Sequence, residues 1–386
     1  MKKEKYRRCK KGLWDTTVPG IQFNEDGVSN YADMLENLMR HYPRGSKGKE
    51  YWGQLVKNIK KNARGKDYNC IIGVSGGTDS SYLLHLAKKE YGLNPLAVNL
   101  DNGWSSDIAV KNIKKITDSL NIDLETYVID YEEVKEVLRS FMKASLPWID
   151  SPTDLAIKAV LYKIADRENI KYILNGSDFR SEGKQPTEWT YSDAKQLLFI
   201  IREYGTGKKL ITYPYYNIIN LFIYGFVKKI KMIRPFYYLD YKKIKAQKFL
   251  TKEYGWEYYG GHHHENIFTK FAIAYWLPKK FNIDKRIITL SAQVLNGEID
   301  RNDAIQSLEK PPYNHRQMER DKDFVLKKLD FSSDDFDRIF QNTNRYFNDY
   351  PSYFPLLRKY QKLANTYFKH ILPFTPGIVV ERKFRN

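Results

Sequence analysis

The amino-acid sequence predicts an α/β fold built on a doubly wound parallel sheet. Short apolar runs alternate with helix-like amphipathic stretches between residues 67 and 185, which is the pattern of parallel strands joined by crossover helices. At residues 70–81 a strand-like run passes through two glycines straight into a helix-like segment. The chain of 386 residues is also long enough to bury a sizeable core. The remaining elements can be placed relative to residues 70–81.

The composition restricts the classes of protein to consider. Lys and Arg outnumber Asp and Glu by 64 to 46, a net charge of +18, which suits nucleic acid, nucleotide sugars or a membrane surface. Two cysteines argue against a disulfide scaffold and indicate a reducing compartment. The first residues lack the apolar core of a secretory signal, and the longest apolar stretch, residues 218–227, is far below the ~20 residues of a spanning helix. We expect a cytoplasmic protein without a transmembrane segment, and peripheral contact with the inner membrane stays open.

Residues 70–81 read C-I-I-G-V-S-G-G-T-D-S-S and predict a phosphate-binding turn. The apolar run at 70–74 is typical of a central strand that is covered on both faces. Gly76 and Gly77 let an anion approach the peptide N–H groups without obstruction by a side chain. The following helix, expected from about Asp79 to Tyr91, directs its N-terminus at the same place. Neither G-x-x-x-x-G-K-S/T nor G-x-G-x-x-G occurs in the chain, which disfavours kinases, GTPases and dehydrogenases.

The run S-G-G-T-D-S resembles the S-G-G-x-D-S signature of the PP-loop ATP pyrophosphatase superfamily. Members of this superfamily split ATP between the α and β phosphates and activate a substrate oxygen as its adenylate. The resemblance implies that ATP is a substrate and that Asp79 is catalytic. It assigns contacts with ATP or pyrophosphate to Ser75, Gly76, Gly77, Thr78, Asp79 and Ser80.

Strands and helices alternate after this turn. Strands are expected at Leu96–Leu100, Glu125–Ile129 and Tyr172–Leu174, and helices at about Asp107–Leu120, Glu132–Met142 and 152–167. Residues just past the carboxyl end of a strand face the ligand crevice of an open α/β sheet. Asp101 is therefore a candidate nucleotide contact and Trp104 a candidate substrate contact, although Asp-Asn-Gly would equally form a plain turn.

The loop after the strand at 172–174 reads N-G-S-D-F-R-S-E-G. Gly176 is a candidate nucleotide contact and Arg180 a candidate substrate contact at this second strand end. The carboxylates of Asp178 and Glu182 are the type of ligand that holds Mg²⁺ on a triphosphate. A solvated polar loop without a metal is the alternative interpretation.

Two further blocks resemble the N-acetyl sugar amidotransferases, a PP-loop family that makes acetamidino sugars for bacterial surface polysaccharides. The first lies in residues 1–66, where the family is expected to hold zinc on two C-x-x-C pairs. Cys9 keeps the first ligand position, but Gly12, Ser29 and Ala32 stand at the other three. One thiolate cannot make a tetrahedral zinc site. We expect a zinc-free, degenerate zinc-ribbon-like lobe, with a flexible linker at residues 43–49.

The second block covers residues 255–313, with G-W-E-Y-Y-G-G-H-H-H-E-N followed by L-P-K-K-F-N-I-D-K-R. The departing pyrophosphate is a polyanion that needs fixed cations. Lys285 and Arg286 are the catalytic candidates for this role, while an ordinary surface pair is the alternative. Substrate contacts are assigned to His263, Lys270 and Lys280.

The chain is expected to divide into five regions. The lobe and linker at 1–66 precede the PP-loop ATP-binding domain at 67–185. Strand and helix alternation is lost at 186–250, which we interpret as an aromatic and basic cap that shapes the acceptor pocket, with membrane contact as the alternative. A helical region for substrate and pyrophosphate follows at 251–320, and a helical appendage at 321–386.

The resemblance implies an ATP-dependent amidotransferase with ATP and Mg²⁺ as cofactors. The acetamido group of an N-acetyl sugar, carried as a nucleotide sugar or a nonulosonic acid, would become an acetamidino group through an adenylated imidate and ammonia. The pathway implied is that of lipopolysaccharide, O-antigen or nonulosonic acid. One alternative is a tRNA-modifying PP-loop enzyme of the lysidine type, which the charge of +18 suits. Another is a non-catalytic scaffold that has lost its zinc site.

The nitrogen source is expected to be a separate protein. Hydrolysis of glutamine needs an activated cysteine nucleophile, and neither Cys9 in a basic segment nor Cys70 inside a strand fits that role. The resemblance implies glutaminase and ammonia-channelling subunits similar to those of histidine biosynthesis. No nucleic-acid partner is expected in the preferred interpretation.

Overall fold

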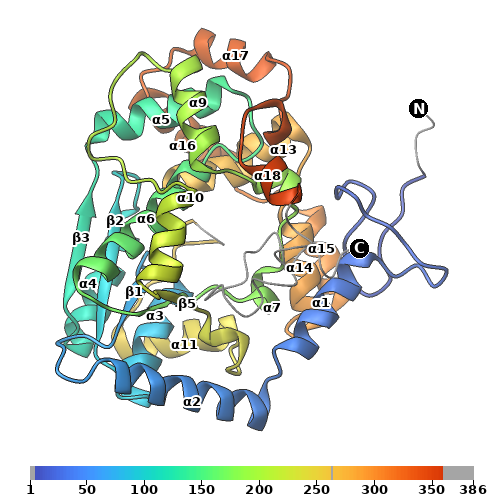
Figure 1. Ribbon diagram of the computed structural model, residues 1–386. Helices are drawn as coiled ribbons and strands as arrows, with labels where there is room; N and C mark the ends of the chain where they lie inside the picture. Colours follow the sequence, from blue (N-terminus) through green and yellow to red (C-terminus); the bar gives the residue numbers. More distant parts are fainter. Residues whose placement is uncertain (1–4, 262–263, 360–386) are drawn as a thin grey trace.

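The computed structural model describes residues 5–261 and 264–359 of the chain. Five parallel strands form one sheet in the order β3-β2-β1-β4-β5. They are β1 (Cys70–Gly73), β2 (Pro95–Asp101), β3 (Leu124–Val128), β4 (Tyr172–Leu174) and β5 (Lys231–Ile233). Figure 1 shows this sheet on one side of the molecule, with helices arranged around it. The predicted α/β class with a parallel sheet is confirmed.

Helices cover both faces of the sheet, as the apolar strands predict. Ile72 on one face of β1 packs in the same cluster as α3 (Thr78–His85) and α4 (Asp107–Leu120). Ile71 on the other face packs with α6 (Ser151–Arg167). The helix after the phosphate turn continues from α3 as a π-helical turn, η1 (Leu86–Glu90). The expected elements between residues 70 and 174 are thus present, with ends shifted by a few residues.

The prediction that strand and helix alternation ends at residue 186 is wrong. β5 pairs in parallel with β4 and completes the sheet from within the supposed cap. Its three residues, Lys-Met-Ile, expose the lysine and bury Met232, so the strand is too short and too basic to stand out in the sequence. The same region also supplies α8 (Thr187–Thr190), α9 (Ala194–Tyr204), α10 (Ile218–Phe222), η2 (Ile223–Val227), η3 (Pro235–Tyr237) and α11 (Lys243–Tyr254).

The predicted flexible linker at residues 43–49 is instead the beginning of a helix, α2 (Gly45–Asn62). Trp52, Val56 and Ile59 recur at helical spacing and are buried. Gly48 lets this helix approach another segment closely, because a Cβ there would lie 2.3 Å from the carbonyl oxygen of Tyr238. The glycine that suggested flexibility therefore permits tight packing.

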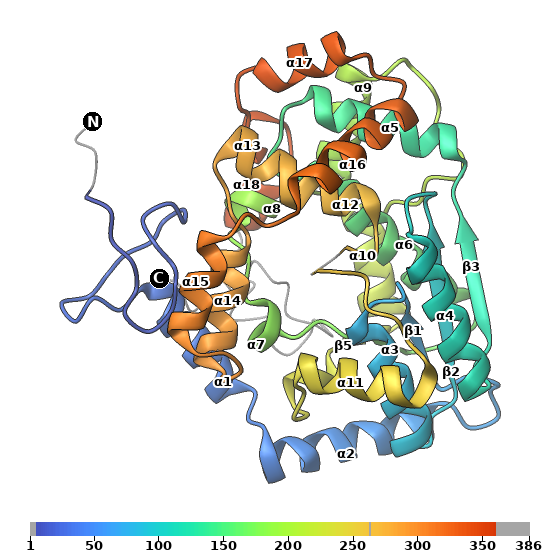
Figure 2. The same ribbon diagram turned by 180° about the vertical axis from the view of Figure 1, so that it is seen from behind.

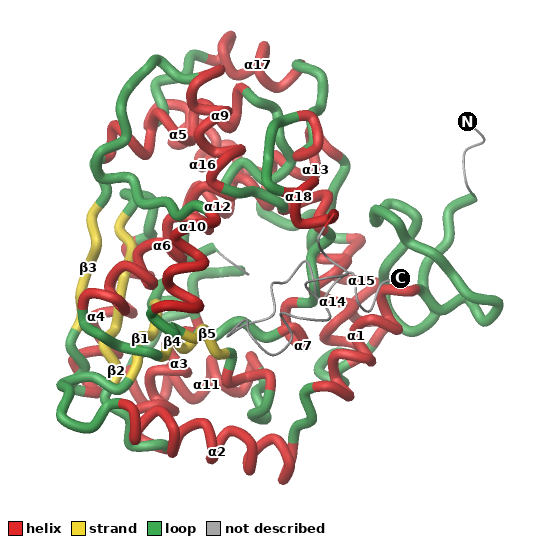
Figure 3. The backbone as a smooth tube through the Cα atoms, in the orientation of Figure 1, coloured by secondary structure: helices red, strands yellow, loops and turns green. Residues whose placement is uncertain are grey.

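The N-terminal lobe ends in α1 (Asn30–His41) and projects from the body as a loop-rich segment (Figure 3). Cys9 is buried, and its Sγ accepts a hydrogen bond of 3.2 Å from the backbone N–H of Ser29. The Ser29 side chain in turn caps α1. A Cβ at Gly12 would lie 2.4 Å from the ring of Trp14, so the indole occupies the space beside that position. Packing around Trp14 and its stacked neighbour Tyr31 fills the lobe.

The largest core lies beyond the sheet and joins distant parts of the chain. It includes residues of α1, α5 (Tyr131–Lys143), α9, α12 (Ile267–Phe271), α14 (Arg286–Leu295), α16 (His315–Lys328) and α17 (Ser333–Gln341). Figure 2 shows α14 beside α15 (Arg301–Glu309) and next to α1. The other elements are α7 (Phe179–Glu182), η4 (Ala272–Trp276), α13 (Leu277–Phe281), η5 (Phe347–Asp349) and α18 (Phe354–Lys359). Within the described residues, no helix combines the length and the hydropathy needed to cross a bilayer.

Candidate active site at the phosphate turn

The phosphate turn (Ser75, Gly76 and Gly77) follows β1, the strand at which the order of the strands in the sheet changes direction. From β1 the chain proceeds to β2 and β3 on one side and later to β4 and β5 on the other. The carboxyl ends of strands at such a switch point form the ligand crevice of α/β sheets. A Cβ at Gly176, just after β4, would lie 3.0 Å from the backbone of Asp79. The end of β4 and the first turn of α3 are therefore adjacent, as the sequence predicts.

Glycine is required within this turn. Gly76 has a φ of +75°, and a Cβ there would lie 2.2 Å from the carbonyl oxygen of Ala109. Gly77 is the N-cap of α3 and has no side chain to block its N–H. Ser75 Oγ accepts from the Gly77 N–H at 3.3 Å, while Ser80 Oγ donates to the Gly77 carbonyl at 3.3 Å. These contacts hold backbone N–H groups and hydroxyls together at a helix N-terminus, an arrangement suited to phosphate.

Side chains of Trp256, Tyr259 and Glu265 contact the turn and the start of α3. The Tyr259 hydroxyl accepts a hydrogen bond of 3.2 Å from the N–H of Thr78. Ser75 Oγ donates to the Glu265 carboxylate at 3.4 Å, and the Trp256 indole donates to the Gly76 carbonyl at 3.0 Å. Trp256, Tyr259 and Glu265 belong to the region 251–320 that was expected to bind substrate and pyrophosphate, although none of the three was singled out as a contact.

Asp79 forms the main ion pair of the site. Its carboxylate accepts a hydrogen bond from the Tyr241 hydroxyl and lies 2.8 Å from the ammonium of Lys243. Burial lowers the pKa of Lys243, but the charges of Asp79 and Glu182 outweigh it and hold the pKa above its usual value. Lys243 is therefore a fixed cation beside the turn. Neither partner of Asp79 was predicted from the sequence, and both lie in the R-P-F-Y-Y-L-D-Y-K-K stretch of the supposed cap.

The loop after β2 forms a turn that is held by its own hydrogen bonds. The Asp101 carboxylate accepts from the N–H of Gly103 at 2.8 Å, which is the plain turn that was considered as the alternative. Trp104 is fully buried and packs against Phe268 with ring centroids 5.4 Å apart. This burial contradicts the predicted contact between Trp104 and the substrate.

Of the two predicted magnesium ligands, Asp178 is held by other protein groups, whereas the charge of Glu182 acts on Lys243 beside the turn. Asp178 is fully buried, caps α7 and pairs with Arg44 at 3.0 Å. Burial raises the pKa of Asp178 to about 6, although Arg44 opposes the shift. Arg180 is also buried, and it donates to the carbonyls of Tyr237 and Tyr42 instead of facing a substrate. The described residues contain no cluster of three or more His, Cys, Asp and Glu side chains that could hold a metal ion.

Three of the predicted cations stabilise the helical region instead of the turn. Arg286 pairs with Asp284 and donates to carbonyls at the end of α15, including that of Lys310 at 2.9 Å. Lys280 donates to the carbonyls at the end of α17, including that of Phe340 at 2.7 Å. Lys270 pairs with Asp321 of α16 at 2.6 Å. These contacts join the three side chains to other helices, and the pyrophosphate and substrate roles predicted for them stay predictions. His263 lies outside the described residues.

Lys285 is placed differently from Arg286. Its ammonium lies 3.8 Å from the centre of the Trp148 ring, and burial lowers its pKa to about 8. Asp154, Asp150 and Glu182 partly counter this shift because their carboxylates stabilise the charged form. Sequence reasoning identified Lys285 but missed these aspartates, because Asp150 and Asp154 lie at a helix start that carries no recognised motif.

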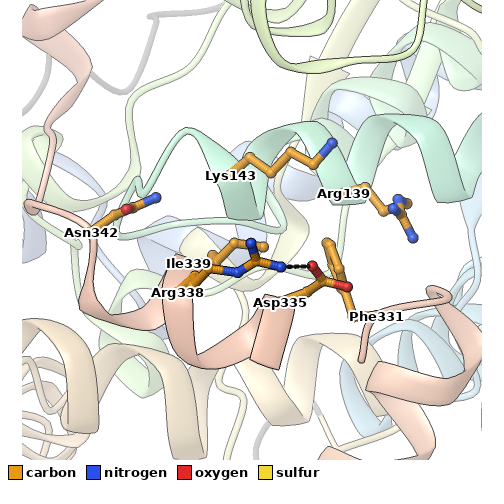
Figure 4. A pocket seen from close by; sticks show the side chains of 7 residues that line it. All are labelled: Arg139, Lys143, Phe331, Asp335, Arg338, Ile339 and Asn342. Atoms are coloured by element: carbon orange, nitrogen blue, oxygen red, sulfur yellow. Dashed lines mark hydrogen bonds and ion pairs between the residues drawn. The ribbon is translucent and has the colours of Figure 1, made fainter. Parts of the chain in front are cut away.

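A shallow hollow of about 290 Å³ lies elsewhere, between α5 and α17 (Figure 4). Its lining side chains are Arg139, Lys143, Phe331, Asp335, Arg338, Ile339 and Asn342. Asp335 and Arg338 pair with each other at 2.6 Å. None of these residues belongs to the turn or to the segment that covers it, so the hollow is separate from the candidate site.

Residues 265–364 match the family model described as "LPS biosynthesis protein WbpG-like, C-terminal domain". This part of the chain is therefore similar to the C-terminal domain of WbpG-like proteins. This match confirms the family resemblance that the motifs predict and links the chain to proteins of lipopolysaccharide biosynthesis. The WbpG-like domain includes Glu265, which contacts the phosphate turn, and Lys285.

Other comparisons cover different parts of the chain. An uncharacterized protein of Methanocaldococcus jannaschii is 28% identical over 158 residues, which are 40% of this chain and 53%, about half, of that relative. An NH3-dependent NAD synthetase from Campylobacter jejuni has a TM-score of 0.32 and 16% identity, covering 66% of this chain and 96% of its own. NMN synthetase from Francisella tularensis has a TM-score of 0.31 and 15% identity, with coverage of 74% and 97%.

Proposed function

We propose that this protein is an ATP-dependent amidotransferase that converts the acetamido group of an N-acetyl sugar into an acetamidino group during synthesis of a surface polysaccharide. The observation that carries the proposal is the glycine turn at the end of the central strand. The N-terminus of α3 begins at this turn, and the turn lies at the switch point of the sheet. The WbpG-like domain supports the pathway.

The reaction would occur in two steps. The acetamido oxygen attacks the α-phosphorus of ATP, and pyrophosphate leaves. Ammonia then adds to the imidate carbon, and AMP leaves with the electron pair of the C–O bond. The chain's part in the first step is to hold the polyphosphate at Gly76 and Gly77 and to neutralise the leaving group with Lys243, which Asp79 keeps in position. Lys243 thus replaces Arg286 in the role that the sequence suggested.

The proposal predicts a product that mass spectrometry can identify. Incubation with ATP, ammonium and a panel of N-acetyl nucleotide sugars and nonulosonic acids should give one sugar in which an oxygen is replaced by NH, together with AMP and pyrophosphate. The matched control is the same incubation without ammonium, which should give no amidine. Release of ADP and phosphate instead of AMP would contradict the proposal, since the PP-loop chemistry splits ATP at the α-phosphorus.

We further propose that glutamine serves as nitrogen source only through a separate glutaminase subunit. Both cysteines of the chain are buried, and burial raises the pKa of Cys70 far above its usual range, so it does not form a thiolate near neutral pH. The purified chain is therefore expected to turn over with ammonium but not with glutamine, and to gain glutamine use when the glutaminase is added. Glutamine-dependent turnover by the chain alone would disprove this division of labour.

A further inference from the structure

Asp150 is a buried carboxylate that the steps above do not use. Its side chain is 3% exposed at the start of α6. Oδ2 accepts a hydrogen bond from the Thr269 hydroxyl, whereas Oδ1 meets no hydrogen-bond partner within the described residues. Buried polar atoms are almost always hydrogen-bonded, and an exception needs a physical explanation. A ligand that donates hydrogen bonds would provide one.

The position of Asp150 connects it to the phosphate turn. Helix α6 packs against β1, β2 and β4 and leads into β4, so its first turn lies at the carboxyl edge of the parallel strands. At that edge the Asn102 side chain donates to Thr153 in the first turn of α6, at 3.4 Å. A second connection is the segment 265–269, in which Glu265 contacts Ser75 and Thr269 contacts Asp150. Only three residues therefore lie between the residue that contacts the turn and the residue that contacts Asp150.

The charges around Asp150 favour a small cation. Asp154 lies one turn further along α6, where its carboxylate accepts from the Trp148 indole at 2.8 Å. Lys285, at the start of α14, lies over the Trp148 ring, and the charges of both aspartates act on it. The same two charges act on Tyr213 in the loop between α9 and α10. Burial and the two carboxylates raise the pKa of Tyr213 well above its usual value, so this phenol stays neutral.

The protonation states near Asp150 can change around neutral pH. Burial, reinforced by the charge of Asp154, raises the pKa of Asp150 to about 7, against the stabilising effect of the nearby threonine hydroxyls. A group with a pKa close to the working pH is well suited to accept and release a proton. The exposed area of Oδ1 is below 1 Å², so a small donor reaches it only when the neighbouring side chains move.

We propose that Asp150 binds the entering ammonium ion through Oδ1 and takes one proton from it. This inference rests on the proposed function. The carboxylate becomes a carboxylic acid, and the lone pair of the resulting ammonia forms the C–N bond to the imidate carbon. The C–O bond to AMP breaks, and AMP keeps the electron pair. The amidine retains its proton as an amidinium ion, and Asp150 then returns its own proton to solvent.

The substitution Asp150→Asn tests the proposal because it keeps the shape of the side chain but cannot accept the proton. Two half-reactions are measured separately: pyrophosphate release with ATP and sugar alone, and amidine formation with ammonium. We expect pyrophosphate release to stay near the wild-type rate and amidine formation at pH 7 to fall by roughly 10²–10⁴-fold. The loss should shrink as the pH rises, because free ammonia becomes more abundant. Asp166→Asn, at the other end of α6 where Asp166 pairs with Lys228, is the matched control and should change neither half-reaction.

A second measurement needs no turnover. Ammonium chloride should raise the Tm of the wild-type chain above its value in sodium chloride at equal ionic strength, and should not do so for Asp150→Asn. Unchanged amidine formation, an equal loss of both half-reactions, or an equal ammonium effect on both proteins would each overturn the assignment. A wild-type chain that releases no pyrophosphate with any N-acetyl sugar would instead contradict the proposed function, and the ammonium effect on the Tm would then decide the Asp150 site alone.

Discussion

Asp79→Asn is expected to lower the rate of pyrophosphate release by about 10²–10³-fold, the usual effect of removing one preorganised electrostatic group. The carboxylate of Asp79 holds the ammonium of Lys243 at 2.8 Å, and both side chains are largely buried, with 19% and 14% of their area exposed. An amide in the same place keeps a hydrogen-bond acceptor for Tyr241 but no longer balances the lysine charge. The cation beside the phosphate turn would then lose its fixed position. The measurement is the rate of pyrophosphate release at saturating ATP.

The control for this experiment is Asp240→Asn, which removes a negative charge from an exposed position three residues before Lys243. Its rate should match that of the wild type. Asp79→Ala is a less clean variant, because Asp79 also connects α3 to Tyr241 and Lys243 near the start of α11. Leaving these partners unsatisfied should lower the free energy of unfolding by roughly 1–3 kcal/mol. Near-normal pyrophosphate release by Asp79→Asn would remove the ion pair from the mechanism.

Gly76→Ala is expected to abolish ATP binding and to lower the free energy of unfolding by clearly more than the roughly 1–2 kcal/mol that a left-handed backbone costs a non-glycine residue. The excess comes from the new Cβ, which would lie 2.2 Å from the Ala109 carbonyl oxygen, a backbone atom that no rotamer change can move. Urea unfolding and calorimetric titration with ATP measure the two effects.

Gly207→Ala is a matched control for the backbone term. Gly207 also has a positive φ, +87°, but a Cβ there would meet no atom within 4 Å. In this variant the free energy of unfolding should fall only by the roughly 1–2 kcal/mol of the left-handed backbone, and ATP binding should be kept. If Gly76→Ala and Gly207→Ala destabilise the chain equally, the close approach between the turn and α4 is not a constraint, and the requirement for glycine at position 76 would concern the backbone alone.

The central part of the fold could be predicted because its signals are local. An apolar run, two glycines and a periodic helix identify β1, the turn and α3 from consecutive residues. The strand β5 could not be found in this way, since its three residues gain their strand conformation by pairing with β4. The short helix α7 could not be predicted for a similar reason. Its C-cap, Gly183, packs closely against Ile288 of α14, which is distant in the sequence.

The candidate site was predicted only in part for a related reason. Four side chains contact the turn or Asp79 from more than 150 residues away in sequence: Tyr241, Lys243, Tyr259 and Glu265. Nothing in the sequence next to each of them indicates that contact. Conversely, the lysines and arginines of the helical region look alike in sequence, whether they face a ligand or bind the carbonyls at a helix end. Lys280 and Arg286 do the latter.

The contact between Glu265 and Ser75 places a negative side chain against the surface that would receive a polyphosphate. The carboxylate would repel a polyphosphate in the turn, so movement of Glu265 away from Ser75 would favour binding of a nucleotide. Because Glu265 lies three residues before Phe268 on a continuous segment that enters α12, its displacement acts on the helix that also holds Thr269. Thermodynamic linkage is reciprocal. A partner or solute that shifts α12 would therefore change the affinity for the nucleotide by some factor. The nucleotide would change the affinity for that partner or solute by the same factor.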